Sequence, residues 1–241
     1  MTCIAAVKKD GKVVIGGDSL LTTGSDKKSG VRKITKFPGC YVGFAGMYAI
    51  RHSLDNLAKD EDFLSTFKMD CIEDARDLAR KVFEVLEEEM ENRDAKSDID
   101  ETALLIVTSK CIFEVDADIT CIEHDDFSAI GSGSRAAKAV IKVLERDNLT
   151  DAMETIRLAI QISTELDSFC GLPMYVYEVL DEPVTPKPKP AKTTKPKTPG
   201  ASKSRTGEGL RNISRMSEGD SPPSNPGKGK FKLKVPKRST K

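Results

Sequence analysis

The second residue of the chain is a threonine that opens an apolar segment, Thr2-Cys3-Ile4-Ala5-Ala6-Val7. An initiator methionine before a residue as small as threonine is normally removed, which would leave Thr2 with a free α-amine. Such an amine titrates near pH ~8, so one residue would carry both a hydroxyl nucleophile and a base. A threonine paired with its own N-terminal amine is a recognised activated nucleophile. Met-Thr is also a common way to begin a protein, so the dipeptide alone decides nothing.

Asp18 and Lys33 are the charged residues that could support this chemistry. The amine must be neutral to accept a proton, and a nearby cation such as Lys33 lowers the pKa of an amine. A buried lysine itself needs a counter-charge. Asp18 ends the strand expected beside the one that Thr2 begins, which brings it within reach of Lys33. The two residues could equally form an ordinary salt bridge on a polar loop.

Two glycine-containing turns supply further candidates. Gly46 follows an apolar strand and precedes an expected helix, so its N–H is expected among the unpaired donors of a helix start. An N–H in that position can bind the oxyanion of a tetrahedral intermediate. The run Gly131-Ser132-Gly133-Ser134 has the composition of a turn of small residues that leads into a second helix. Plain strand-to-helix turns would have the same composition.

The order and spacing of these pieces closely resemble the β-type proteasome subunits, especially the single-subunit bacterial kind known as HslV. The resemblance runs from Thr2 to about Val179 and rests on Gly-Asp at 17–18, Lys33, Ala-Gly at 45–46 and Gly-Ser-Gly at 131–133. It implies a self-compartmentalising threonine endopeptidase, in which Ser132 would hold the N-terminal amine toward the nucleophile. The catalytic residues implied by the resemblance are Thr2, Asp18, Lys33, Gly46, Ser132 and Asp167.

The segment before the last strand departs from the family pattern. The family commonly has Asp-x-x-Ser-Gly, whereas this chain has Asp167-Ser168-Phe169-Cys170-Gly171. Because a thiol is a weak hydrogen-bond donor and acceptor, the network that orients the amine is expected to be looser. Cys170 is therefore expected near the site, or it is instead a small buried hydrophobe.

The resemblance also aligns five residues with the first specificity pocket of the family. Four of them are apolar or aromatic and none is charged, which predicts cleavage after apolar residues. Phe44 and Tyr48 could equally be core side chains. The five positions are Leu21, Val31, Thr35, Phe44 and Tyr48.

Charge and proline divide the chain into two parts. From Glu182 onward there are 16 Lys/Arg and 4 Asp/Glu, and ten of the twelve prolines, whereas residues 1–181 carry a net charge of −12. We therefore expect an acidic globular domain over 1–181 and a disordered basic tail over 182–241. Such a tail could contact nucleic acid or an acidic protein surface, or could be a solvated extension without a partner.

Several classes of protein are disfavoured by composition. No apolar run reaches the 18 residues of a membrane span and no secretory signal is apparent, which favours a cytoplasmic protein without membrane contact. The six cysteines form no CxxC pair, and the two histidines have no metal-ligand spacing. We therefore expect no disulfide frame, no metal site and no cofactor.

Apolar periodicity gives the expected elements. Strands are expected in a hairpin over residues 1–18 with its turn at Asp10-Gly11, and at 33–37, 40–45, 103–107, 111–115, 119–122, 127–131 and 174–179, with a polar loop over 19–30. Helices are expected from Met47, over 70–92 with a capping box of Asp70 and Glu73, over 135–146 with Ser134 as N-cap, and over 151–166 with Thr150 as N-cap. This order suits two sheets stacked between helical layers. The resemblance specifies an α+β fold, the four-layer αββα sandwich of the N-terminal nucleophile hydrolases.

The resemblance further implies partners: a homo-oligomeric ring or double ring that encloses the active sites, unfolded polypeptide substrates, and an AAA+ unfoldase that delivers them. Two other functions stay open. The chain could be a non-catalytic shell or scaffold subunit of the same fold, or a small-molecule amidohydrolase of the wider superfamily.

Overall fold

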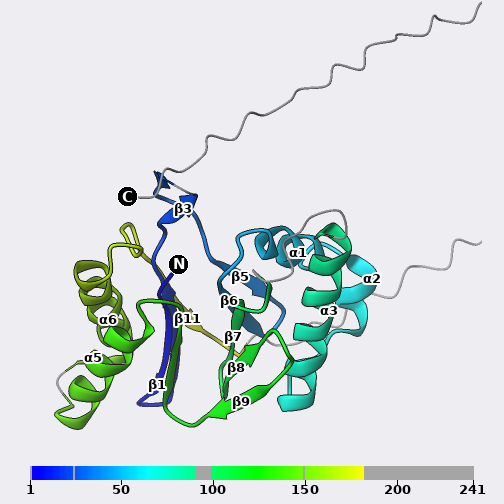
Figure 1. Ribbon diagram of the computed structural model, residues 1–241. Coiled ribbons are helices and arrows are strands. Elements are labelled where there is room, and N and C mark those ends of the chain that lie inside the picture. The colour runs from blue at the N-terminus through cyan, green and yellow to red at the C-terminus, as the bar shows by residue number, and fades with distance from the viewer. Residues whose placement is uncertain (1, 24, 91–98, 149, 182–241) are drawn as a thin grey trace, which may run out of the picture. The chain divides into compact units, whose positions relative to one another are not determined.

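The computed structural model describes residues 2–23, 25–90, 99–148 and 150–181 of the 241-residue chain. Two antiparallel sheets form the centre of this part, and helices cover the outer face of each one (Figure 1). Met1 and the predicted basic tail at 182–241 lie outside the described residues. No helix of the described part is long and apolar enough to cross a membrane.

The first sheet holds four strands in the order β10-β1-β2-β11, and helices α5 and α6 pack on it. The bounds are β1 (Ile4–Lys9), β2 (Lys12–Gly17), β10 (Phe127–Ile130), β11 (Tyr175–Val179), α5 (Ser134–Arg146) and α6 (Ala152–Leu166). Helices α5 and α6 lie side by side against each other, and α6 contacts β1, β2 and β11.

The second sheet holds five strands in the order β5-β6-β7-β8-β9. Helices α1, α2 and α3 lie on its face that is turned away from the first sheet (Figure 1). The bounds are β5 (Ile34–Phe37), β6 (Cys40–Ala45), β7 (Ala103–Thr108), β8 (Ile112–Asp116), β9 (Cys121–His124), α1 (Ile50–Leu57), α2 (Glu61–Thr66) and α3 (Ile72–Met90). The expected αββα sandwich is confirmed.

Strand alternation sorts the core into three layers. In β1, Ala5 and Val7 face α5 and α6, whereas Ile4 and Ala6 face the other sheet. In β7, Leu104 and Ile106 pack under α1 and α3, while Leu105 and Val107 fill the space between the sheets. Because successive side chains of a strand point to opposite faces, a strand covered on both sides is apolar throughout. The run at 103–107 therefore has the burial that its composition predicts.

The first hairpin forms as expected and positions the start of the chain. Asp10 and Gly11 have φ values of 52° and 73°, the positive region that a tight hairpin turn requires. The register pairs Ile4 with Gly17. Thr2 and Asp18 therefore both lie just beyond the same end of the β1-β2 pair.

Several local expectations were wrong. The loop at 19–30 contains a small hairpin of β3 (Leu21–Thr23) and β4 (Asp26–Lys28), and α2 was not anticipated. The N-cap of α6 is Asp151, whose side chain accepts from the Glu154 N–H at 2.8 Å, and not Thr150.

The other two helix starts also differ from expectation. Helix α5 has Gly133 at its N-cap and includes Ser134 in its first turn. At the start of α3, Asp74 accepts from the N–H groups of Asp70 and Cys71 at 2.8 and 3.1 Å, so the acceptor is Asp74 and not the Asp70–Glu73 box. Nearby carboxylates compete for the same free N–H groups, and their order in sequence does not decide which one reaches them.

Candidate active site

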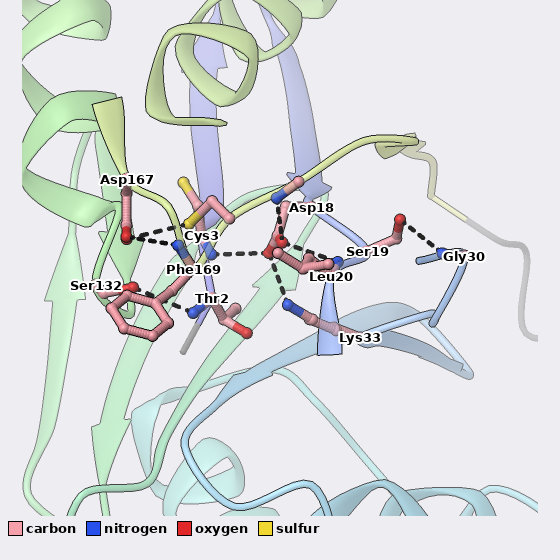
Figure 2. A network of polar contacts seen from close by, with 12 residues as sticks. Thr2, Cys3, Asp18, Ser19, Leu20, Gly30, Lys33, Ser132, Asp167 and Phe169 are labelled. Carbon is pink, nitrogen blue, oxygen red and sulfur yellow. Dashed lines mark hydrogen bonds and ion pairs between the residues drawn. The ribbon is translucent and has the colours of Figure 1, made fainter. Parts of the chain in front are cut away.

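The carboxylate of Asp18 is the centre of a buried polar network at the end of β2 (Figure 2). Its Oδ1 accepts from the Cys3 N–H at 2.9 Å and from Lys33 Nζ at 2.8 Å. Its Oδ2 accepts from the N–H groups of Leu20 and Gly171, both at 3.0 Å. Asp18 is 1% exposed, so these four donors replace the water that a surface carboxylate would bind.

Lys33, like Asp18, is deeply buried and fixed by contacts with the rest of the protein. Its side chain is 2% exposed, and its backbone carbonyl accepts from the Phe44 N–H at 3.1 Å, which ties it to the C-terminal end of β6. The structure therefore brings Asp18 and Lys33 together as a buried ion pair. The alternative interpretation was an ordinary salt bridge on a polar loop, and such bridges are usually exposed, whereas this pair is buried.

Thr2 lies between this ion pair and the turn at 131–134. Its residue is 3% exposed, and its carbonyl accepts from the Gly133 N–H at 3.2 Å. Its backbone nitrogen donates to Ser132 Oγ at 3.3 Å. In Figure 2 the nitrogen of Thr2 faces Ser132, whereas its side chain points toward Lys33. The two ends of one residue thus face two different polar groups.

Gly131 allows the turn to approach Thr2. Its φ is +86°, and a Cβ added there would lie 2.2 Å from the Thr2 carbonyl oxygen and 3.2 Å from Ala45 Cβ. Any side chain would therefore be excluded both by the backbone conformation and by the contact. Because Ala45 is the last residue of β6, this contact also brings the end of β6 beside Thr2.

Asp167 continues the network from Ser132. Its carboxylate accepts from the Phe169 N–H at 2.9 Å and from Cys170 Sγ at 3.3 Å, and the nearby Ser132 side chain also lowers its pKa. Partial burial raises the pKa of Asp167, but these hydrogen bonds outweigh it and hold that pKa below its ordinary value. Ser132 therefore accepts from Thr2 on one side and lies near the Asp167 carboxylate on the other.

Cys170 was expected either near the site or as a small buried side chain, and it is both: it is 4% exposed and it contacts Asp167. Burial, with the charge of Asp18 as a lesser cause, raises the pKa of the Cys170 thiol. Burial likewise raises the pKa of Cys3 to about 12. A Cβ added at Gly133 would lie 2.8 Å from Cys3 Cβ and 2.9 Å from Cys170 Sγ, so the two thiol residues flank the same turn.

Gly46 is not at a helix N-terminus as expected, because α1 begins four residues later at Ile50. Its φ of +110° is the reason a glycine is needed, and a Cβ there would lie 2.6 Å from both Cα and Oγ1 of Thr102. The Gly46 N–H forms no hydrogen bond within the described part of the chain, whereas the next N–H, that of Met47, donates to Thr102 Oγ1 at 3.2 Å. Gly46 directly follows Ala45 and so lies close to the Thr2 end of β6.

The residues aligned with a specificity pocket are spread over different environments. Phe44 is 2% exposed and belongs to the core under α1 and α3, so it has a packing role. Tyr48 is 38% exposed, and its ring lies 6.3 Å from that of Phe44. Val31 and Thr35 are buried and Leu21 is half-buried. Cleavage after apolar residues stays a prediction.

The sequence did not reveal three members of the network. Cys3, Leu20 and Gly171 hold Asp18 through backbone N–H groups, which any non-proline residue supplies and which leave no signature in residue type. The glycine at 171 gives a partial signal, because a Cβ there would lie 3.0 Å from Leu20 Cβ.

Comparison with known proteins identifies the family. The family model described as "Proteasome subunit" matches residues 1–179. The chain belongs to the proteasome subunit family. The resemblance to β-type proteasome subunits and HslV is confirmed. This family is one of threonine-type proteases.

Individual members of the proteasome family are similar over most of the described part. The chain is 30% identical over 169 residues to the "ATP-dependent protease subunit HslV" of Treponema denticola, which covers 68% of this chain and 89% of the relative. The solved HslV of Trypanosoma brucei is 26% identical with a TM-score of 0.55, over 73% of this chain and 98% of that one.

The fold also matches "Thiobacillus denitrificans BPH", at 24% identity and a TM-score of 0.66 over 75% of this chain and 99% of that one. A second structure of that protein is in complex with epoxomicin, and it matches with a TM-score of 0.63.

Proposed function

We propose that this chain is a threonine endopeptidase whose nucleophile is Thr2 after removal of Met1. The observation that carries the proposal is the position of Thr2, with its nitrogen on Ser132 Oγ at 3.3 Å and its side chain toward the buried Lys33–Asp18 pair. A threonine with a purely structural role would need neither Ser132 nor the ion pair beside it. A nucleophile that carries its own base needs both.

The reaction follows from the two ends of Thr2. The α-amine takes the proton of the hydroxyl, directly or through a water, as Oγ1 attacks the carbonyl carbon of a peptide bond. The tetrahedral intermediate collapses, its C–N bond breaks, and the ammonium gives its proton to the leaving nitrogen. A water that the same amine deprotonates attacks the remaining ester, the bond between the acyl carbon and Oγ1 breaks, and the ammonium returns its proton to Oγ1. The cycle ends with the hydroxyl and the neutral amine both restored.

The neighbouring residues have separate roles in this proposal. Lys33 supplies a positive field that keeps the amine neutral, and Asp18 supplies the counter-charge that keeps the lysine buried. Ser132, oriented by Asp167, holds the amine in place. The Gly46 N–H, at the end of β6, is the donor proposed for the oxyanion; loss of one such donor costs ~10²–10³ in rate.

The assembly is proposed from the family. An isolated subunit of this kind would cleave proteins indiscriminately, so we infer a homo-oligomeric ring or double ring that encloses the Thr2 sites. The relative from Treponema denticola is named as a subunit of an ATP-dependent protease. We extend this to an AAA+ unfoldase that supplies unfolded polypeptides to the present chain.

Epoxomicin, which is bound in the second Thiobacillus structure, provides a chemical probe for the same site. We expect it to block peptide hydrolysis by the wild-type protein.

The mass of the intact protein tests the proposal before any activity is measured. Loss of Met1 from the assembled protein, visible as a mass lower by one methionine residue, is the expected result. If Met1 is retained in the assembled, purified protein, Thr2 has no free amine and the mechanism is wrong. Because a methionine before threonine is normally removed in any protein, loss of Met1 is necessary for the mechanism, and the activity of Thr2→Ala is what separates the enzyme from a non-catalytic shell subunit.

A further inference from the structure

Phe169 is an exposed aromatic residue beside the candidate active site, and the mechanism gives its side chain no role. The residue is 38% exposed, whereas its backbone N–H is committed to Asp167 at 2.9 Å. Ser132, which accepts from the nitrogen of Thr2, lies near the Asp167 carboxylate and lowers its pKa. The backbone of Phe169 is therefore held by a polar group that neighbours the amine-binding serine.

The ring lies on one particular side of Thr2. In the view of Figure 2 the phenyl group points to the side of Thr2 on which its nitrogen and Ser132 lie, away from Lys33. Within the described residues, Phe169 belongs to none of the three buried hydrophobic clusters. The ring of Phe169 is therefore an accessible apolar surface on the Ser132 side of the site.

Proton transfer decides which part of a substrate lies on that side. The α-amine must donate to the leaving nitrogen when the C–N bond breaks, so the two nitrogens must come within hydrogen-bond reach, about 2.6–3.2 Å. The residue after the scissile bond is attached to that leaving nitrogen. Its side chain must therefore lie near the amine and Ser132, where the ring of Phe169 is located.

We propose that Phe169 is a specificity-determining residue that contacts the side chain directly after the scissile bond and favours apolar residues there. The inference rests on the proposed function, because it uses the α-amine of Thr2 as the proton donor. Burying an exposed phenyl face against an apolar side chain is favourable in proportion to the area removed from water. A charged or very small side chain gains little from the same ring.

The test compares peptides that differ only in the residue after the cleaved bond, with leucine, phenylalanine, glycine or aspartate at that position. Phe169→Ala keeps the N–H that binds Asp167, so it removes the side-chain contact alone. We expect kcat/KM for the leucine and phenylalanine peptides to fall about tenfold in this variant, which corresponds to the burial of part of one ring. The values for the glycine and aspartate peptides should change less than twofold.

Leu166→Ala is the matched control, since Leu166 is an apolar residue 73% exposed at the end of α6 in the same segment. It should leave all four peptides unchanged. An equal fall for all four peptides in Phe169→Ala, or no fall for any, would overturn the inference. Thr2→Ala separates this from failure of the function itself: if it abolishes cleavage while Phe169→Ala leaves the preference unaltered, only the present inference is wrong. If Thr2→Ala retains cleavage, the proposed function fails first.

Discussion

Lys33 Nζ and Asp18 Oδ1 lie 2.8 Å apart, and their side chains are 2% and 0% exposed. A charge pair at this depth depends on both members, because removal of one leaves the other buried without compensation. The pair also joins two parts of the fold, since Asp18 directly follows β2 of the first sheet and Lys33 directly precedes β5 of the second. Stability and catalysis are therefore expected to depend on the same contact.

Replacement of the lysine measures that dependence. Lys33→Met is expected to lower the free energy of unfolding by about 3–5 kcal/mol and to abolish peptide hydrolysis, measured by urea titration and by a fluorogenic peptide. Arg80→Met is the control, because the Arg80–Asp77 pair on α3 is equally short at 2.6 Å but has side chains 54% and 70% exposed. It should have little effect on either measurement. Equal effects of the two variants would show that burial of the Lys33 pair is unimportant.

The close contact between Gly131 and Thr2 gives a second prediction. Gly131→Ala must strain a backbone with φ of +86° and also displace the Thr2 carbonyl, so we expect it to lower stability by about 2–3 kcal/mol and to remove activity. Gly39→Ala has a similar φ of +74°, but open space around the added Cβ. It should cost only about 1–2 kcal/mol of backbone strain and leave the rate of peptide hydrolysis intact. Full activity in Gly131→Ala would contradict the contact.

Cys170 is expected to limit the rate, because its thiol is a weak donor to Asp167 at 3.3 Å. Cys170→Ser supplies a stronger donor to the same carboxylate, and we expect kcat to rise about two- to fivefold. Cys121→Ser, at a cysteine 7% exposed in the core under α1 and α3, should change stability without raising kcat. A fall in kcat for Cys170→Ser would indicate that the thiol acts by packing and not as a donor.

Buried thiols predict a loss of stability at alkaline pH. Burial raises the pKa of both Cys3 and Cys40 from 9.0 to about 12. Between these pH values the unfolded chain loses thiol protons that the folded chain keeps, so stability falls as pH rises. Each thiol contributes a slope of about −1.4 kcal/mol per pH unit in that window and nothing well below it. The stability difference between wild type and Cys40→Ala, followed by urea unfolding from pH 8 to 11, should shrink by that slope; a constant difference would contradict the buried thiol.

The sequence predicted the parts of the fold that depend on local chemistry. Asp10-Gly11 can form only a few kinds of turn, and the apolar run at 103–107 had to be covered on both faces. The sequence missed features decided by competition in three dimensions. Thr150 and Asp151 are both good caps, and only the path of the chain selects Asp151. Gly46 was expected at a helix start, but Thr102 approaches it closely and α1 begins only at Ile50.

The site shows the same division. Thr2, Asp18 and Lys33 could be named because their side chains carry the chemistry, and Ser132 and Asp167 because of the resemblance to the family; the structure brings the five together. The donors from Cys3, Leu20 and Gly171 are backbone groups, which residue type does not encode. The sequence did not single out Phe169, because the role of an exposed aromatic side chain depends on the groups that lie beside it in the folded protein.

The hydrolysis of a fluorogenic peptide by Thr2→Ala and wild-type protein, compared as assembled proteins of equal concentration, tests the central claim most directly. The account predicts that the wild type, with Met1 removed, cleaves the peptide and that Thr2→Ala is slower by at least about 10³-fold, since nucleophile removal leaves only binding and oxyanion stabilisation. Equal cleavage by the two proteins, or none by a fully trimmed wild type, would contradict it.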